Sequence, residues 1–125
     1  MNKMQTPLSR VRGLGSAKSG VHHFWHQRVT AVALVPLVLW FVWSVVVYTG
    51  APHEEVVYFL QQPFNAAAML LLVLAGLYHM SLGLQVVIED YIHAEGMKIA
   101  LLLATRFAAF AVATISALAI LRIAI

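Results

Sequence analysis

Residues 70–91 read LLLVLAGLYHMSLGLQVVIEDY, an apolar run that ends in two carboxylates and a tyrosine. The run belongs to a longer stretch, residues 56–88, that carries no charged side chain. A helix rises about 1.5 Å per residue, so about 20 apolar residues cross the hydrocarbon core of a bilayer. The sequence therefore predicts a membrane-spanning helix over residues 64–91, after a short surface segment that ends at Pro63. His79 lies inside that helix, where a titratable ring is costly and usually has a functional reason.

The composition indicates an integral membrane protein, because 62% of the residues are apolar, 10% are charged and none is cysteine. Two further apolar runs are long enough to span a bilayer. Residues 29–50 carry no charge, and residues 99–125 are interrupted only by Arg106 and Arg122. The predicted fold is all-α, an integral membrane bundle of three transmembrane helices. Its parts are an N-terminal cytoplasmic arm at 1–28 and a three-helix membrane domain at 29–125, with helices at about 29–50, 64–91 and 97–124.

Basic residues predict the orientation, because cytoplasmic segments of membrane proteins are enriched in lysine and arginine. The loop at residues 51–63 contains no basic residue, whereas five precede the first predicted helix. We therefore expect a cytoplasmic N-terminus and, after three crossings, a C-terminus on the opposite side. The basic arm would face anionic lipid headgroups or a peripheral protein, and nothing in the chain indicates nucleic acid binding. The five basic residues are Lys3, Arg10, Arg12, Lys18 and Arg28.

Gly76 and Gly83 stand three residues before and four residues after His79, so all three share one face of the predicted helix. A histidine between two missing side chains leaves a shallow, flat slot. Such a slot suits a planar macrocycle whose iron is bound by an imidazole nitrogen, which makes His79 a candidate haem ligand. The alternative is a histidine that is hydrogen-bonded to a neighbouring helix, with glycines that permit close helix packing.

Asp90 and Tyr91 follow His79 by eleven and twelve residues, which corresponds to roughly 16 Å along the helix axis. If Asp90 marks the cytoplasmic interface, His79 lies near the midplane of the bilayer. Tyr91 can donate a hydrogen bond to a quinone carbonyl, and Asp90 can orient the phenol or belong to a proton route. The alternative is an ordinary polar helix end with an interfacial tyrosine.

The number of candidate ligands predicts a partner, because a low-spin electron-transfer haem normally has two axial ligands. No histidine lies in the other two predicted spans, so the second ligand would come from another polypeptide, either a different subunit or a second copy. Arg28 can pair with a haem propionate through its planar fork, with help from His22. Alternatively, Arg28 reaches lipid phosphate and His22 lies on the surface.

The pattern Val21-His22-x-Phe24-x-x-x-Arg28, followed by His79 and by Asp90-Tyr91, resembles the small hydrophobic anchor subunit of succinate dehydrogenase, respiratory complex II. The resemblance covers nearly the whole chain. It implies that His79 is an axial ligand of haem b, with the other ligand on a companion cytochrome b anchor subunit. It also implies that Tyr91 binds a ubiquinone carbonyl with Asp90 beside it, and that Arg28 and His22 lie near the haem propionates and the quinone.

The same resemblance implies docking to an iron–sulfur subunit and a flavoprotein subunit, in the tricarboxylic acid cycle and aerobic electron transport. Electrons from succinate would reach ubiquinone at the membrane boundary, while this chain alone carries no catalytic residue for succinate. The expected location is the bacterial inner membrane, multi-pass, with a periplasmic C-terminus, rather than the mitochondrial inner membrane. His23 departs from the pattern, because some relatives have an acidic residue there, and Glu89 adds a carboxylate beside Asp90.

Three other functions remain open on the sequence. A homodimeric membrane b-type cytochrome would use His79 from both copies, and a fumarate reductase anchor would work in the reverse direction. A small non-haem transporter or structural subunit would use His79 as a hydrogen-bonding or proton-relay group. Arg106 is also open: it reaches toward the inner interface or pairs with a haem propionate.

Overall fold

The computed structural model describes residues 6–12 and 20–125, and the regular structure of these residues is entirely helical. Three of the helices are long and apolar enough to cross a membrane. The predicted fold, an all-α membrane protein with three spanning helices, is confirmed. In chain order the helices are α1 (Pro7–Arg12), α2 (Gly20–Tyr48), α3 (His53–Gln61), α4 (Pro63–Tyr91) and α5 (Glu95–Ala124).

The first spanning helix begins earlier than the sequence predicts, at Gly20 instead of residue 29. The polar residues before Val29 do not break a helix; they only make it too polar for the hydrocarbon core. At 29 residues α2 is about 44 Å long, which exceeds the roughly 30 Å core, so its first turns extend into the interface. Pro36 lies inside α2 without ending it, as neighbouring contacts allow in membrane helices.

The predicted chain breaks lie where the structure changes direction. Gly50 has a φ of 82°, a left-handed conformation that glycine adopts without a Cβ penalty. Pro63 is the first residue of α4, where its missing N–H costs no helical hydrogen bond. The predicted surface segment before Pro63 is itself a helix, α3, and residues 92–94 join α4 to α5.

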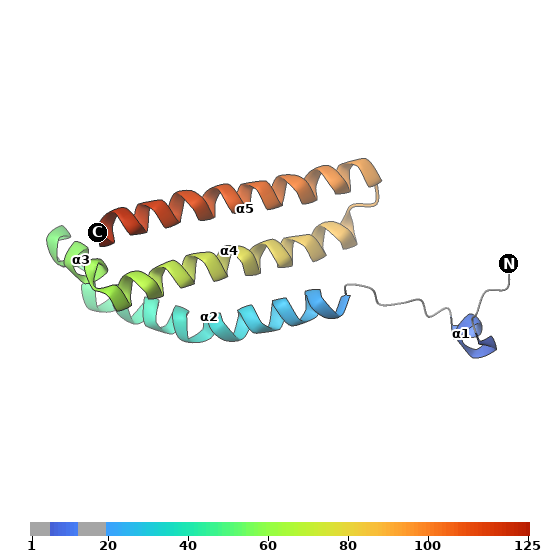
Figure 1. Ribbon diagram of the computed structural model, residues 1–125, viewed down its shortest axis with the longest axis horizontal. Helices are drawn as coiled ribbons and strands as arrows, with labels where there is room; N and C mark the ends of the chain where they lie inside the picture. The colour runs from blue at the N-terminus through green and yellow to red at the C-terminus, as the bar shows by residue number, and fades with distance from the viewer. Residues whose placement is uncertain (1–5, 13–19) are drawn as a thin grey trace.

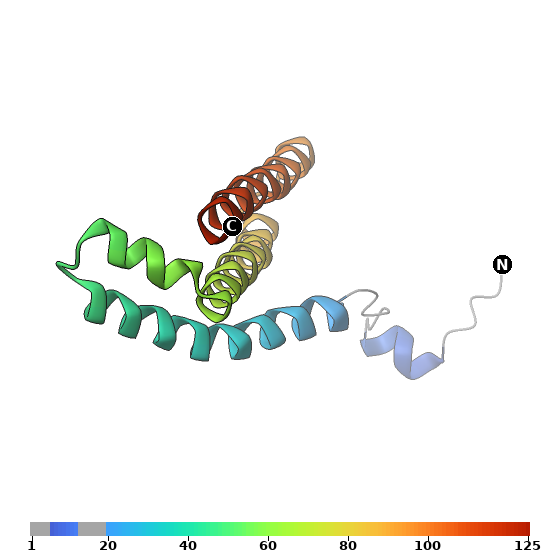
Figure 2. The same ribbon diagram turned by 60° about the vertical axis from the view of Figure 1, so that its left-hand side comes forward.

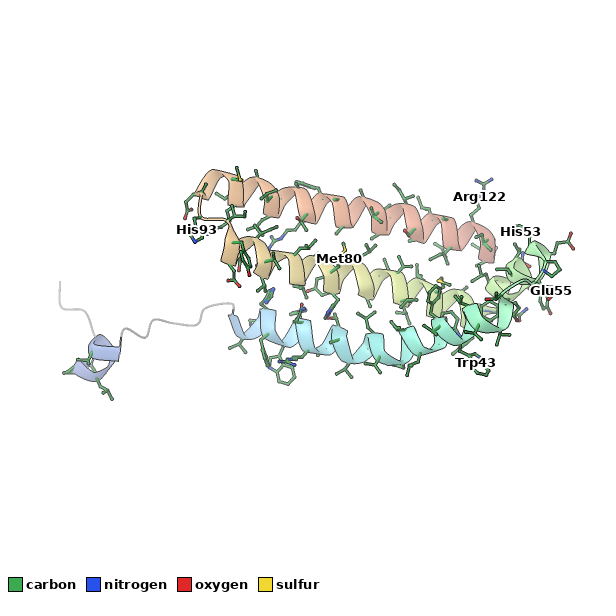
Figure 3. The ribbon with its side chains drawn as sticks, turned by 180° about the vertical axis from the view of Figure 1, so that it is seen from behind. Trp43, His53, Glu55, Met80, His93 and Arg122 are labelled. Carbon is green, nitrogen blue, oxygen red and sulfur yellow. The ribbon has the colours of Figure 1, made fainter. Side chains whose placement is uncertain are left out.

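The three long helices lie side by side with α4 in the middle, as Figures 1 and 2 show. Helix α4 packs against α2 on one side and α5 on the other, and α3 packs against α4 and α5. Figure 2 also shows that α2 is inclined to the other two. In Figure 3, His53, Glu55 and Arg122 lie at one end of the bundle and His93 lies at the other.

Aromatic rings join α3 to the C-terminal half of α2. Phe59 stacks on Trp40 with ring centroids 6.1 Å apart, and its centroid lies 4.5 Å from that of Tyr48. The Asn65 side chain donates to the Phe59 carbonyl at 2.9 Å, which ties the start of α4 to the same place. These contacts fix the turn between the first two spans.

Very little of this bundle is buried within the chain itself. Among the described residues, only Ser44, Ala68 and Leu82 are buried, and large apolar side chains such as Trp43 point outward. A helix that is apolar all round needs an apolar surrounding on every face. The chain is therefore a multi-pass membrane protein whose faces are covered by lipid or by other membrane helices.

Candidate functional site

His79 lies on α4, and its ring faces α2. The Thr30 hydroxyl oxygen is 2.9 Å from Nδ1 of this ring, and the Gln27 side-chain nitrogen is 3.5 Å from Nε2. One ring nitrogen therefore has a short hydrogen bond, and the other has only a long contact. The hydrogen bond to a neighbouring helix that the sequence offered as an alternative is present, but it uses Nδ1 and leaves Nε2 loosely held.

An open groove of about 560 Å³ lies between α2 and α4 beside this ring. A second groove of about 420 Å³ continues along α2 toward its C-terminal end and is lined by apolar side chains and His79. Ala31 and His79 border both grooves, so together they form one seam. We call the polar groove near the start of α2 the inner groove and the apolar one the outer groove. The inner groove is lined by Gly20, His23, Phe24, Gln27, Arg28, Ala31, His79, Gly83 and Val86.

Gly76 and Gly83 both face α2, as their spacing around His79 predicts. A Cβ added at Gly83 would lie 3.9 Å from the Gln27 side-chain nitrogen, and one added at Gly76 would lie 4.0 Å from a Leu34 methyl. These are ordinary van der Waals distances, so neither glycine is required by a backbone clash. Gly83 lines the inner groove, and its missing side chain leaves that groove open beside His79.

The inner groove has unpaired polar atoms. His23 Nε2 and Gln27 Oε1 are buried and have no hydrogen-bond partner among the described residues. The Arg28 guanidinium lies 5.1 Å from the centroid of the Phe24 ring, a cation–π distance, and it lines the same groove. Buried polar atoms are normally paired, so a polar group in the inner groove could form hydrogen bonds with these atoms.

Of the two predicted residues on the inner part of α2, Arg28 lines the groove, and His22 is exposed and not among the lining residues. Its neighbour His23 lines the groove instead, together with Gln27. Thr30 does not line the groove but contacts the His79 ring, and sequence reasoning missed both Gln27 and Thr30. Residues 23, 27 and 30 share a helical face, and this signal could have found them if the helix had been extended back to Gly20.

Asp90 and Tyr91 lie in the last turn of α4 and are exposed, Tyr91 to 76%. Neither is among the residues that line the His79 seam. The structure therefore places both at the end of the helix that carries His79, on a surface open to another molecule.

Arg106 lies away from the His79 seam, on the other side of α4. Its guanidinium donates to the Gln85 side-chain oxygen at 3.2 Å, and Gln85 in turn donates to Glu89 at 2.8 Å. Arg106 and Gln85 line a separate groove of about 450 Å³ between α4 and α5. Arg106 therefore does not line the His79 seam in this chain.

Tyr78 adds a second polar contact between α2 and α4. Its hydroxyl is 2.9 Å from His26 Nδ1, and the two rings meet edge to face with centroids 5.9 Å apart. Consecutive residues of α4, Tyr78 and His79, thus bind consecutive turns of α2. The relative position of the two helices is set at the level of the candidate ligand.

Comparison with known proteins gives a consistent result. Residues 2–113 match the family described as succinate dehydrogenase/fumarate reductase transmembrane subunit. The chain is 36% identical over 110 residues to a succinate dehydrogenase hydrophobic membrane anchor subunit of Rickettsia bellii, a match that covers 88% of this chain and 86% of that one.

A protein of the same description in Paracoccus denitrificans is 33% identical over 102 residues, covering 82% of this chain and 79% of that one. A succinate dehydrogenase membrane anchor subunit of Reclinomonas americana is 34% identical over 85 residues, covering 66% and 71%. No solved structure gives a significant match. A family match over most of the chain, together with relatives of this similarity, means that this chain belongs to the family of succinate dehydrogenase/fumarate reductase transmembrane subunits.

Proposed function

We propose that this chain is the hydrophobic membrane anchor subunit of a succinate:ubiquinone oxidoreductase and that His79 is an axial ligand of its haem b. The observation that carries the proposal is the position of His79, in the middle of a membrane span and bordering an open groove between α2 and α4. The proposal is supported by the relatives, which are described as anchor subunits of succinate dehydrogenase.

The residues of the seam fit a haem. His79 Nε2 has only a 3.5 Å contact to Gln27 and is the donor available to iron. His23 Nε2, which has no partner, and the Arg28 guanidinium suit the carboxylates of the propionates at the inner end. Leu34 and Val38 offer an apolar surface at the outer end. When bound there, haem supplies a one-electron centre.

The seam offers no second axial ligand for the iron, and this points to a partner subunit. His23 is separated from Thr30 by seven residues, about 10 Å of helix, so it lies too far along the axis to be the second ligand of an iron on His79. We assign the second ligand to a companion cytochrome b anchor subunit packed against the α2–α4 face. The iron–sulfur and flavoprotein subunits would dock on the cytoplasmic side.

Ubiquinone is the proposed electron acceptor, bound near the last turn of α4. Tyr91 would donate a hydrogen bond to a quinone carbonyl, with Asp90 beside it. Because Tyr91 is 76% exposed, the walls of this site would come from the companion and iron–sulfur subunits. Electrons from succinate would enter at the flavin of a peripheral subunit, and this chain would do no succinate chemistry itself.

The proposed location is the bacterial inner membrane, with the N-terminus in the cytoplasm and the C-terminus in the periplasm. The basic residues before the first span support this orientation, as does the absence of lysine and arginine from residues 51–63. In this orientation the last turn of α4 meets the cytoplasm, where the peripheral subunits would bind.

The test is purification of the native assembly through a tag on this chain, followed by identification of its subunits and a reduced-minus-oxidised spectrum. We expect the three partner subunits and a b-type spectrum. His79→Ala should abolish or perturb that spectrum, whereas His53→Ala is the matched control, because His53 lies at the far end of the bundle (Figure 3).

An unchanged spectrum in the His79→Ala assembly would defeat the ligand assignment. A b-type haem without a companion anchor would indicate a homodimeric cytochrome, and an assembly without haem or quinone would indicate a transporter or structural subunit. Turnover of the purified assembly in both directions would distinguish succinate oxidation from fumarate reduction.

A further inference from the structure

We propose that Thr30 is a positioning residue for His79. Its hydroxyl accepts the hydrogen bond of Nδ1–H, which fixes the tautomer and the plane of the imidazole and leaves Nε2 to the haem iron. The inference rests on the proposed ligation of haem by His79 and adds the hydrogen bond that orients this ligand.

The direction of the Thr30–His79 bond follows from a count of hydrogens. Thr30 Oγ1 lies 2.7 Å from the His26 carbonyl oxygen, 3.2 Å from that of Gln27 and 2.9 Å from His79 Nδ1. A hydroxyl has one proton, and a carbonyl oxygen can only accept. The proton therefore belongs to the short bond with the His26 carbonyl, an arrangement common for threonine inside helices. The remaining partner, Nδ1, must carry its own proton and donate it to Thr30.

The second ring nitrogen agrees with this assignment. A neutral imidazole protonated at Nδ1 has its lone pair on Nε2, and this lone pair is what binds a metal. Nε2 is in contact with the side-chain nitrogen of Gln27, a donor, at 3.5 Å. Both sides of the ring thus specify the same tautomer. The contact with Gln27 is long enough to be given up at little cost.

The bond also fixes the ring plane. Thr30 is held to its own helix by the bond to the His26 carbonyl, and His79 comes from the facing helix. A ligand histidine held through its other ring nitrogen keeps its orientation and becomes a better electron donor to the metal. Removing the acceptor should therefore loosen the ring and weaken its donation to ferric iron, which raises the midpoint potential of the haem.

The experiment compares three variants in the whole purified assembly. Thr30→Val keeps the shape of the side chain and removes the hydroxyl, whereas Thr30→Ser keeps the hydroxyl. Thr114→Val is the matched control, because the Thr114 hydroxyl also donates to a carbonyl one turn earlier in its span, at 2.9 Å from Phe110 O, and has no histidine contact. The readouts are haem per assembly, the haem midpoint potential and the g values of the ferric haem, which depend on the plane of the axial imidazole.

We expect Thr30→Val to shift the midpoint potential upward, change the ferric g values and lower the haem content. Thr30→Ser and Thr114→Val should match the unmodified chain in all three readouts. The proposal is overturned if Thr30→Val has the same three readouts as the unmodified chain. It is also overturned if Thr30→Ser changes the readouts as much as Thr30→Val does, which would indicate an effect of packing, or if Thr114→Val has the same effect as Thr30→Val.

Failure of this inference is distinguishable from failure of the proposed function. If His79→Ala abolishes the b-type spectrum while Thr30→Val changes none of the three readouts, only the role of Thr30 is wrong. If the assembly contains no haem, or keeps its spectrum without His79, the ligand assignment fails and the role of Thr30 fails with it.

Discussion

Gly83 controls how much room the seam offers beside His79. A Cβ at this position would be 3.9 Å from the Gln27 side chain, so Gly83→Ala should keep the full haem content. Gly83→Leu should fill the groove, at an overpacking cost of about 1–3 kcal/mol. If this cost falls on haem binding, the affinity for haem should fall about fivefold to 150-fold, since about 1.4 kcal/mol corresponds to tenfold. Haem per purified assembly is the measurement.

A leucine at Gly96 is the control for this comparison, because nothing lies within 4 Å of a Cβ there. Gly96→Leu should leave the haem content unchanged. A Gly83→Leu assembly with full haem would show that the groove beside His79 is not where the macrocycle lies.

At this scale the sequence predicts one side of the seam and misses the other. The spacing of Gly76, His79 and Gly83 follows from helix geometry within one element, and it places all three toward α2. The shared face of His23, Gln27 and Thr30 on α2 could also be read from their spacing once the helix is extended back to Gly20. That this face, and no other, meets His79 depends on how the two helices pack, which no local pattern contains.

The contact between α4 and α5 supports a prediction about paired substitutions. Gln85→Leu removes the acceptor of the Arg106 guanidinium, which has no ion pair within the described part of the chain and lies within a span. Stranding such a donor costs about 1–3 kcal/mol or more, whereas replacing both partners by apolar groups can be nearly neutral. Gln85→Leu alone should therefore lower the thermal stability of the assembly more than the double variant Gln85→Leu/Arg106→Leu.

Arg106→Leu alone should leave the b-type spectrum unchanged, because Arg106 lines a different groove from His79. Equal stability of the single and double variants would argue against the Gln85 contact. Loss of haem in the Arg106→Leu assembly would indicate that Arg106 pairs with a haem propionate.

The elements themselves are well predicted from sequence, because the length of an apolar run is set by the thickness of the bilayer. Helices α4 and α5 begin within two residues of their predicted starts and end where predicted. The start of α2 is wrong by nine residues, because polarity marks the edge of the hydrocarbon and not the edge of the helix. Because the predicted helix started at residue 29, the prediction did not show that His23 and Gln27 share a face of α2.

The membrane topology of the whole molecule can be tested by labelling introduced cysteines, because the chain itself contains no cysteine that would be labelled. Glu55→Cys places a thiol on α3, and Glu95→Cys places one at the start of α5, at the opposite end of the bundle. With a cytoplasmic N-terminus, a reagent that cannot cross the inner membrane should label Glu55→Cys in intact spheroplasts. It should label Glu95→Cys only after lysis, and the reverse pattern would invert the orientation.

The two halves of α2 are held by different forces. Its N-terminal half is joined to α4 by the hydrogen bonds of His26 and Thr30 and by the long contact of Gln27, whereas its C-terminal half is held to α3 by the ring contacts of Trp40 and Tyr48. Water that enters with short-chain detergents competes for hydrogen bonds but not for stacked rings. We therefore expect the seam to open first at the N-terminal end of α2, while the helices remain formed. If haem is bound in the seam, pigment content should decline before helical content does in such preparations, and loss of colour should be the earlier sign of damage.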